Sequence, residues 1–402
     1  MQSYFDNAAT TPLDPRVIRE MHTALLECYG NPSSLHRTGR MAREAVEKAR
    51  AQVASLLRAS PEEIYFTGSG TEAANLALMG VCAERESDYH IITSQFEHPA
   101  VAETCQALKR QKSNHRVEVS FLPVNSEGFV EPSELVKALR KNTKLVSIMA
   151  ANNVVGTLQP ITELGRITHE HGALFHTDAV QAVGKIPFNL ASQPIDLLSL
   201  SAHKFNGPKG VGALFVRKEL KLSPLILGGG QERGLRSSTE NVAGIVGMGF
   251  AAELAKQEMA EEASRLVRFR DRIIESVTTN IPNAYLIGDP YRRLPGHLCF
   301  GFQGQEGEAI RLLLTLDEFQ IAVSSGSACS ASHADEPSSV LMAMGMNPIQ
   351  ARGSLRVTLG RFNTDADVDH FLEVLPKATA QLRSIKTNFH PTNTNFQKRG
   401  HS

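Results

Sequence analysis

Residues 197–216 read LLSLSAHKFNGPKGVGALFV, with an apolar run at each end and a loop rich in glycine and proline between them. Short apolar runs bounded by turn residues are typical of buried β-strands. The loop from Ser201 to Val211 is too short for the crossover that parallel neighbours need, so we expect an antiparallel pair. It carries Lys204 directly after a strand, where burial would make its amine nucleophilic or basic. An ordinary surface lysine in a loop is the alternative interpretation of the same sequence.

The chain before this pair alternates between strand and helix patterns. Five short apolar runs are typical of buried strands: 64–67, 90–93, 117–124, 145–151 and 173–176. Helical patterns lie before and between them: 16–28, 39–57, 71 onward, 100–112, 132–140 and 161–171. Strands that alternate with helices predict an α/β fold with a mostly parallel sheet covered on both faces.

The pattern changes near residue 241, where a long and increasingly charged helical segment runs to about residue 280. Beyond it we expect strands at 298–302 and 355–359 and helices at 306–318 and 365–385, with Thr364 as an N-cap. We therefore predict a large domain over 13–255 and a smaller α+β domain made of 1–12 and 256–385. The polar segment 386–402 is expected to be a loose tail.

The composition excludes several classes of protein. The 402 residues contain 42 basic and 42 acidic side chains and no tryptophan, which argues against direct nucleic-acid binding or a polybasic membrane anchor. The five cysteines are scattered, which indicates a reducing compartment. No leader or membrane-spanning pattern is present, so we expect a cytoplasmic protein. The spacing of His169, His171 and His176 fits no common zinc site, so we expect no metal.

Two motifs resemble parts of an anion or cofactor site. Residues 66–72, FTGSGTE, place a small-residue turn between a strand and a helix, where backbone N–H groups can hold a phosphate. The turn lacks the lysine of a P-loop and the spacing of a dinucleotide site, and an ordinary capped helix fits it as well. Asp178 ends a predicted parallel strand, where α/β sheets place ligands and where a carboxylate can pair with a protonated ring nitrogen. A simple helix cap is its alternative.

Two more candidates lie near the C-terminus. Cys329 is part of SSGSACSASH, whose small side chains predict a reachable thiol, although a buried inert cysteine is the usual reading of one cysteine alone. Arg356 alternates with apolar residues in GSLRVTLGR, so it faces either a cleft, where it can clamp a carboxylate, or solvent.

The order of these parts resembles that of the group I, NifS/IscS-type cysteine desulfurases in the class V aminotransferase family. The resemblance runs from Tyr4 to about Phe362, nearly the whole chain. Its matching stretches are YFDNAATTPLDP, GNPSSLHRTGR, FTGSGTEAANLA, FEHPAV, ANNVVGTLQPI, FHTDAVQAVGK, SLSAHKFNGPKGVGALFV, GGGQERGLRSSTENVAG, VSSGSACSAS and GSLRVTLGRF. It implies a fold-type I, aspartate aminotransferase-like enzyme with a seven-stranded sheet, which uses pyridoxal 5'-phosphate.

The resemblance also implies roles around the cofactor ring. Lys204 would bind the cofactor covalently, Asp178 would pair with the pyridine nitrogen, Gln181 would donate toward the phenolic oxygen, and His98 would stack on the ring. The residues implied to hold the phosphate are Gly70, Thr71, Ser201, His203 and, from the other subunit of a homodimer, Thr239.

The substrate implied by the resemblance is L-cysteine. Asn153 would lie near the ring and the substrate, Arg356 with help from Asn31 would hold the carboxylate, and Cys329 would accept the sulfur. L-alanine would leave, and the persulfide on Cys329 would pass to an acceptor protein. That acceptor would act in iron–sulfur cluster assembly or in thiolation of a nucleic acid or cofactor.

Some positions depart from the family pattern. Val154 replaces an acidic residue, Ser238 replaces a glycine beside Thr239, and the phosphate turn reads TGSGT. The tail after Ile385 does not resemble the segment with which housekeeping members dock their scaffold, so the acceptor stays open. Two alternatives remain at this point. One is a selenocysteine lyase, or another lyase or aminotransferase of the same fold. The other is a scaffold that binds partners without catalysis.

Overall fold

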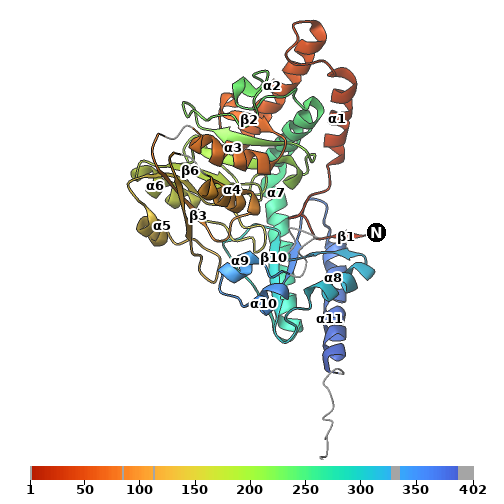
Figure 1. The fold of residues 1–402 in the computed structure, drawn as a ribbon. Helices are drawn as coiled ribbons and strands as arrows, with labels where there is room; N and C mark the ends of the chain where they lie inside the picture. Colours follow the sequence, from red (N-terminus) through yellow and green to blue (C-terminus); the bar gives the residue numbers. More distant parts are fainter. Residues whose placement is uncertain (1, 84–85, 112–113, 327–335, 388–402) are drawn as a thin grey trace, which may run out of the picture.

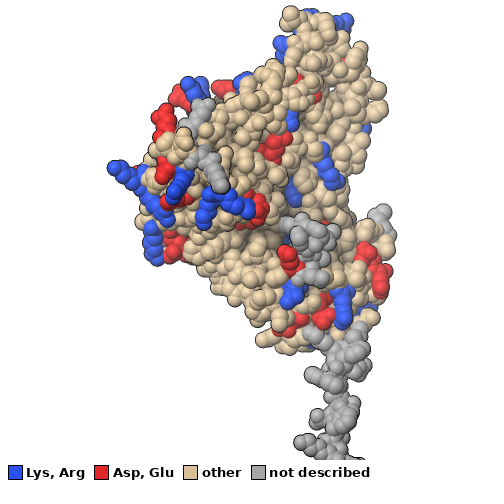
Figure 2. All heavy atoms as spheres, viewed as in Figure 1, with Lys and Arg blue, Asp and Glu red and all other residues tan. Residues whose placement is uncertain are grey.

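The computed structural model describes residues 2–83, 86–111, 114–326 and 336–387. The described chain has two parts, one built on a seven-stranded sheet and one on a four-stranded sheet, and the long helix α7 (Val242–Asn280) runs along both (Figure 1). Within these ranges no helix has both the length and the apolar character of a membrane span. Basic and acidic side chains are interspersed on the face drawn in Figure 2, as the balanced composition leads one to expect.

The larger sheet has the order β2-β8-β7-β6-β5-β3-β4. Strand β8 is antiparallel to both of its neighbours, and every other pair is parallel. The structure therefore confirms the mostly parallel seven-stranded sheet and the antiparallel pair. The strands are β2 (Ile64–Thr67), β3 (Tyr89–Ser94), β4 (Val117–Leu122), β5 (Thr143–Ser147), β6 (Leu174–Asp178), β7 (Leu197–Ser201) and β8 (Gly212–Val216).

Helices cover both faces of this sheet because neighbouring strand residues point to opposite sides. On β7, for example, Leu198 belongs to the core with α2, α6 and α7, whereas Leu197 belongs to the core with α3 and α4. The helices of this part are α1 (Pro15–Glu27), α2 (Arg37–Leu57), α3 (Gly70–Cys82), α4 (Pro99–Arg110), α5 (Pro132–Ala138) and α6 (Ile161–Glu170), with single 3-10 turns η1 (Pro61–Glu63), η2 (Ala202–Lys204) and η3 (Glu232–Gly234).

The smaller part has an antiparallel sheet of order β12-β13-β10-β9 and a two-stranded parallel pair, β1-β11. Its core joins the N-terminal Phe5 to Phe300 and Phe371, and it includes Phe269 from the far half of α7. The elements are β1 (Ser3–Tyr4), β9 (Ala284–Leu286), β10 (His297–Phe302), α8 (Ala309–Glu318), β11 (Ile321–Ala322), β12 (Ser324–Ser325), α9 (Ser339–Ala343), α10 (Pro348–Arg352), β13 (Leu355–Thr358) and α11 (Asp365–Thr387).

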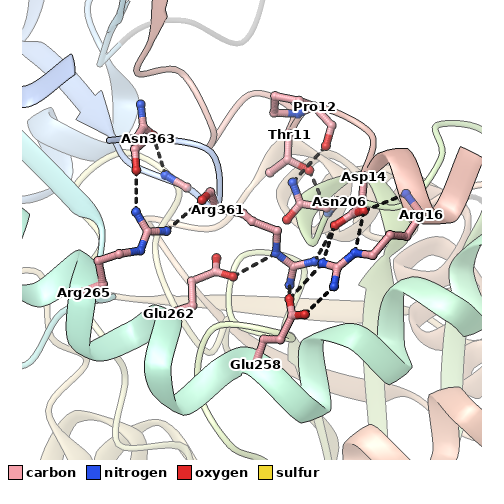
Figure 3. A network of polar contacts seen from close by, with 11 residues as sticks. Thr11, Pro12, Asp14, Arg16, Asn206, Glu258, Glu262, Arg265, Arg361 and Asn363 are labelled. Atoms are coloured by element: carbon pink, nitrogen blue, oxygen red, sulfur yellow. Dashed lines mark hydrogen bonds and ion pairs between the residues drawn. The ribbon is translucent and has the colours of Figure 1, made fainter. Parts of the chain in front are cut away.

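A polar network ties the start of the chain to the end of β13 and to α7 (Figure 3). Arg361 donates to Asp14 and to Glu262, each at 3.0 Å, and Arg265 donates to the Arg361 carbonyl at 2.8 Å. Asp14 also caps α1 by accepting from the Arg16 backbone at 2.9 Å. These contacts hold the N-terminal segment against both cores, and that segment enters the cleft described below.

Two of the predicted boundaries differ from the structure by three residues or more, and several others by one or two. The strand expected at 145–151 is β5, which ends at Ser147, because residues 152–157 turn back and Gln159 N donates to the Ala150 carbonyl at 3.0 Å. The helix expected from residue 306 begins at Ala309, since Gly304 and Gly307 both adopt φ of +85°, which no right-handed helix contains. The segment 388–402 of the expected tail lies outside the described residues.

Candidate active site

A cleft of about 560 Å³ opens at the carboxyl ends of β6 and β7. Its volume lies within the range of about 300–1,000 Å³ that is common for small-molecule and cofactor sites. The larger part supplies most of the lining, the N-terminal segment crosses it, and Arg356 comes from β13 of the smaller part. The polar residues that line the cleft, together with Gly70, are Thr10, Ser69, Thr71, His98, Asn153, Asp178, Gln181, Ser201, His203, Lys204, Lys209 and Arg356.

Lys204 is the last residue of η2, the turn that follows β7 directly. Its Nζ donates to the carbonyl oxygens of Ala8 at 2.5 Å and of Ala9 at 2.7 Å. The amine is therefore held by the N-terminal segment at the wall of the cleft. A lysine with an unhindered approach from the cleft can condense with an aldehyde and can later act as a base.

Asp178 is the last residue of β6 and is buried. Its Oδ1 accepts from the Val180 backbone at 2.9 Å. Burial raises the pKa of this carboxyl, whereas the nearby His98 and Lys204 act in the opposite direction. A cationic ring nitrogen in the cleft would supply the counter-charge that a buried carboxylate needs.

His98 is the N-cap of α4, and its Nδ1 accepts from the Ala100 backbone at 3.1 Å. Because Nδ1 accepts, the proton of the neutral ring lies on Nε2. The preceding residue, Glu97, accepts from Ser94 Oγ at 2.7 Å and from the Met149 backbone at 3.0 Å, so it ties the His98 turn to the segment after β5. Burial raises the pKa of Glu97 to about 8.

The start of α3 forms an anion cradle beside the end of β7. Ser69 caps the helix by accepting from Glu72 N at 3.1 Å, and Gly70 and Thr71 follow it. A Cβ on Gly70 would lie 2.7 Å from Val180 Cγ2 and 3.2 Å from Ser201 Cβ, so only glycine leaves this space open. A helix N-terminus with serine and threonine hydroxyls beside it suits a phosphate group.

His203 closes the cradle from η2, with its Nδ1 3.1 Å from Thr10 Oγ1. Burial, together with the charges of Lys204 and Lys209, lowers the pKa of His203 to about 4. The ring is thus neutral at neutral pH and acts there as a hydrogen-bonding group and not as a cation.

Gln181 and Asn153 complete the walls of the cleft. Gln181 Nε2 donates to the Ala8 carbonyl at 2.9 Å, so this amide and Lys204 share one acceptor. Asn153 lies in the turn after β5, and its carbonyl accepts from Arg356 Nη1 at 3.0 Å.

Arg356 points from β13 toward the cleft and is 3% exposed. Besides the Asn153 carbonyl, it contacts Asp6, whose Oδ1 lies 2.9 Å from Arg356 Nη2. Its Nε is buried and has no protein partner. An arginine with a spare N–H at a cleft wall suits a carboxylate ligand.

The N-terminal segment is the part of the site that we did not assign from the sequence. Asp6, Ala8, Ala9 and Thr10 contact Arg356, Gln181, Lys204 and His203, in the ways given above. The stretch YFDNAATTPLDP was among the matching motifs, so it carried a signal, but it contains no lysine, histidine or cysteine that would have singled out a role.

Two predicted site residues do not lie with the others in this chain. Asn31 and Thr239 are exposed and do not line the cleft of their own chain. Cys329 lies outside the described residues. Ser238, beside Thr239, adopts φ of +137°, a backbone conformation that favours glycine.

The residues present fit pyridoxal phosphate. The cleft offers an anion cradle at Gly70, a buried acid for a protonated ring nitrogen at Asp178, and an amine for an aldehyde at Lys204. The unpartnered Nε of Arg356 adds a place for the carboxylate of an amino acid. Among the described residues, no group of three or more His, Cys, Asp and Glu side chains is placed to hold a metal ion.

Comparisons with known proteins agree with this chemistry. The model of the family described as aminotransferase class-V matches residues 3–371. The cysteine desulfurase IscS of Dictyoglomus turgidum is 50% identical over 383 residues, covering 95% of this chain and 95% of that protein. The cysteine desulfurase IscS of Methanosarcina thermophila is 48% identical and covers 95% and 93%. A solved NifS-like protein superposes with a TM-score of 0.87 at 41% identity, covering 95% of this chain and 100% of that one.

Proposed function

The chain belongs to the class V aminotransferase family and is a cysteine desulfurase of the NifS/IscS type that depends on pyridoxal phosphate, and from this premise we propose how its residues divide the reaction. Lys204 carries the cofactor, Asp178 and His98 act on its ring, Arg356 holds the carboxylate of L-cysteine, and Cys329 accepts the sulfur. The observation that carries this proposal is the meeting of Lys204, Asp178 and Arg356 in one cleft, from segments far apart in sequence.

Bound pyridoxal phosphate supplies an electron sink that makes the Cα–H bond of an attached amino acid acidic. The buried Asp178 carboxylate would keep a proton on the ring nitrogen, because a cation there satisfies a charge that burial disfavours. His98 would cover one face of the ring, since the Ala100 N–H fixes its ring orientation. The start of α3 and Ser201 would hold the phosphate.

Lys204 would serve as the base. The Ala8 and Ala9 carbonyls hold its amine at the cleft wall within a small range of positions. The amine would take the Cα proton and return it to the substrate carbon skeleton.

Cys329 would attack the sulfur of the substrate. Its loop leaves the smaller sheet at β12, where Ser324 is paired with Arg356, and returns before α9 at Ser339. Cys329 comes five positions after Ser324 in the sequence, and an extended chain of that length spans up to about 17 Å. A chain of this length is long enough for the thiol to reach the residue that would hold the carboxylate of the substrate, which supports a direct attack.

The sulfur transfer balances without an external oxidant. The Cys329 thiolate forms a sulfur–sulfur bond with the substrate thiol as the substrate Cβ–S bond breaks. The electron pair of that bond stays with the carbon skeleton, which takes up a proton and leaves as L-alanine. The second sulfur remains on Cys329 as a persulfide, ready for an acceptor thiol. Because Cys329 must be a free thiol at the start, we place the protein in the cytoplasm.

Replacing Cys329 tests this step. In Cys329→Ala the cofactor should remain bound, while release of L-alanine from L-cysteine should fall at least 100-fold. Cys28→Ala is the matched control, because Cys28 is a free cysteine at the end of α1 with partial exposure, and it should keep the wild-type rate. Wild-type turnover by Cys329→Ala would refute the sulfur-acceptor role.

We propose a homodimer in which Thr239 completes the phosphate site of the other subunit. Thr239 is exposed in its own chain, and large apolar side chains are exposed on α1 and on the segment after it: Ile18, Leu25, Leu26, Tyr29 and Leu35. Contiguous apolar exposure of this kind marks association surfaces. Asn31 lies on the same segment and would reach the cleft of the other subunit, beside Arg356.

Mixed dimers test the arrangement. A chain with Lys204→Ala and a chain with Thr239→Ala would form one site with both changes and one site with neither. The mixture should therefore recover activity that neither homodimer has. If Thr239 acts within its own chain, the mixture shows only the average of the two parents.

The sulfur acceptor would be a protein with an exposed thiol that approaches the Cys329 loop, in iron–sulfur cluster assembly or in thiolation of a nucleic acid or cofactor. Labelling with ³⁵S-cysteine, followed by non-reducing separation of a lysate from the native host, identifies the protein that receives label. Cys329→Ala should abolish that transfer, and persistence of the same labelled protein would refute passage through Cys329.

A further inference from the structure

Asp6 makes a contact with the cleft that the proposed function does not use. Its Oδ1 lies 2.9 Å from Arg356 Nη2, and its side chain is 21% exposed whereas that of Arg356 is 3% exposed. The pair joins residues 350 positions apart in sequence. It brings a carboxylate to the arginine that would bind the carboxylate of the substrate.

The backbone holds Asp6 firmly in this place. The Asp6 carbonyl accepts from Tyr4 Oη and from Ala9 N, each at 3.0 Å. Asp6 also forms a parallel bridge with Thr358, two residues beyond Arg356 on β13, and the adjacent Asn7 donates to the Thr358 carbonyl at 2.7 Å. The carboxylate therefore approaches Arg356 from a fixed backbone and not from a mobile surface residue.

The contacts of Arg356 leave room for a ligand. Nη1 donates to the Asn153 carbonyl at 3.0 Å and Nη2 to a single oxygen of Asp6, so each terminal nitrogen keeps a second N–H. Nε is buried without a protein partner. Asp6 thus occupies one corner of the guanidinium and does not fill the place that both oxygens of another carboxylate require.

A held guanidinium binds more tightly than a free one. An arginine side chain has several rotatable bonds, and ordering it when a ligand arrives costs affinity. With Asp6 on one side and the Asn153 carbonyl on the other, that ordering has already taken place.

We propose that Asp6 is a positioning residue for the carboxylate of the substrate, acting through Arg356, whose Nε and remaining N–H groups it keeps directed at the cleft. The inference rests on the proposed role of Arg356. It predicts that Asp6 controls the affinity for α-carboxylates and not the binding of the cofactor.

The test measures the affinity of the holoenzyme for two ligands from the change in cofactor absorbance. One ligand is the product L-alanine, and the other is L-alaninamide, which lacks the carboxylate charge. Asp6→Ala should lower the affinity for L-alanine at least tenfold and the affinity for L-alaninamide less than twofold, with unchanged cofactor content. Asp6→Asn, which keeps a hydrogen-bond acceptor of the same shape, should fall between Asp6→Ala and the wild type. Asp365→Asn breaks an exposed pair with Arg268 and should change neither ligand.

Arg356→Lys separates the role of Arg356 in the proposed function from the positioning role of Asp6. Arg356→Lys alone should lower the affinity for L-alanine at least tenfold. Adding Asp6→Ala should lower that affinity less than a further twofold, because both changes act at one contact. Wild-type L-alanine affinity in Arg356→Lys would overturn the role of Arg356 in the proposed function. If Arg356→Lys behaves as expected, the positioning role alone is overturned when Asp6→Ala weakens both ligands equally or tightens L-alanine.

Discussion

Arg361 donates to Asp14 across the boundary between the two parts of the chain, with Nη1 3.0 Å from Oδ2 (Figure 3). The two side chains are only 10% and 2% exposed. Asp14 also caps α1, so the acid that starts the first helix of the larger part holds Arg361, three residues beyond β13 of the smaller part. The N-terminal segment that forms one wall of the cleft runs between these anchors.

We predict that Asp14→Asn lowers the free energy of unfolding by about 2 kcal/mol at pH 7, because the largely buried Arg361 loses one of its carboxylate partners and keeps Glu262. Burial alone would raise the pKa of Asp14, but the hydrogen bonds from Arg16 and Arg361 outweigh it and hold the pKa below its ordinary value. The stabilisation is therefore complete above the unfolded pKa of about 4 and is lost as the pH falls further. Urea titrations at several pH values measure it.

The control for this prediction is Asp365→Asn, whose exposed pair with Arg268 should contribute less than about 1 kcal/mol. A difference between wild type and Asp14→Asn that stays constant from pH 7 to pH 3 would show that the charge is not what stabilises the contact.

Protonation of buried histidine should make the protein less stable in mild acid. His176 lies between Ser147 Oγ at 2.8 Å and Ser199 Oγ at 2.9 Å, and burial lowers its pKa to about 3. The unfolded chain binds this proton near pH 6.5, so the contribution of His176 is complete above pH 6.5 and falls as the pH drops toward 3.

Replacing His176 by Gln should therefore flatten the dependence of stability on pH by up to about 1.4 kcal/mol per pH unit within that window. Above pH 7 the stabilities of the wild type and the variant should depend on pH in the same way, whatever the overall loss of stability in the variant. Equal slopes for the two proteins from pH 6 to pH 4 would count against a neutral buried histidine.

Asp178→Asn should keep the cofactor and lose turnover. The amide cannot balance a cationic ring nitrogen, so we expect turnover to fall on the order of 100-fold or more. Asp196→Asn is the control: Asp196 contacts His169 at 2.7 Å just before β7, at the opposite end of the sheet, and its loss should affect stability and not turnover. Turnover of Asp178→Asn within a few-fold of wild type would refute the role of Asp178.

Ser238→Gly should stabilise the protein. Ser238 adopts φ of +137°, where a side chain is strained and glycine is not. Relief of strain should exceed the entropy that glycine adds to the unfolded chain, for a net gain of about 1 kcal/mol. Ser192 is an exposed serine whose φ is not positive. Ser192→Gly should therefore lower the free energy of unfolding by a few tenths of a kcal/mol. A fall in melting temperature for Ser238→Gly would contradict the prediction.

The sequence predicted those parts of the fold and site that local patterns determine. Strands β2 and β8 have the predicted bounds, because short apolar runs between turn residues have few other solutions. Asp178 and Lys204 were found for a related reason. Asp178 ends β6 and Lys204 ends the turn η2 directly after β7, and the carboxyl ends of parallel strands gather at one edge of the sheet.

What the sequence did not predict depends on contacts between distant segments. Asp6 meets Arg356 and Ala8 meets Lys204 only because β1 pairs with β11 and the N-terminal segment crosses both cores. Strands of two residues, such as β1 and β12, have no periodicity to detect. The late start of α8 depends on two glycine residues in the left-handed conformation, which the apolar pattern does not show.

The most direct test of the account is the identity of the lysine that carries the cofactor. Lys204 and Lys185 line one small cavity beside the cleft, so both are near enough to compete. Borohydride reduction of the holoenzyme, followed by peptide mass mapping, fixes the bond to its residue. We expect the cofactor adduct on Lys204 and an unmodified Lys185. An adduct on Lys185, or on no lysine, would contradict it.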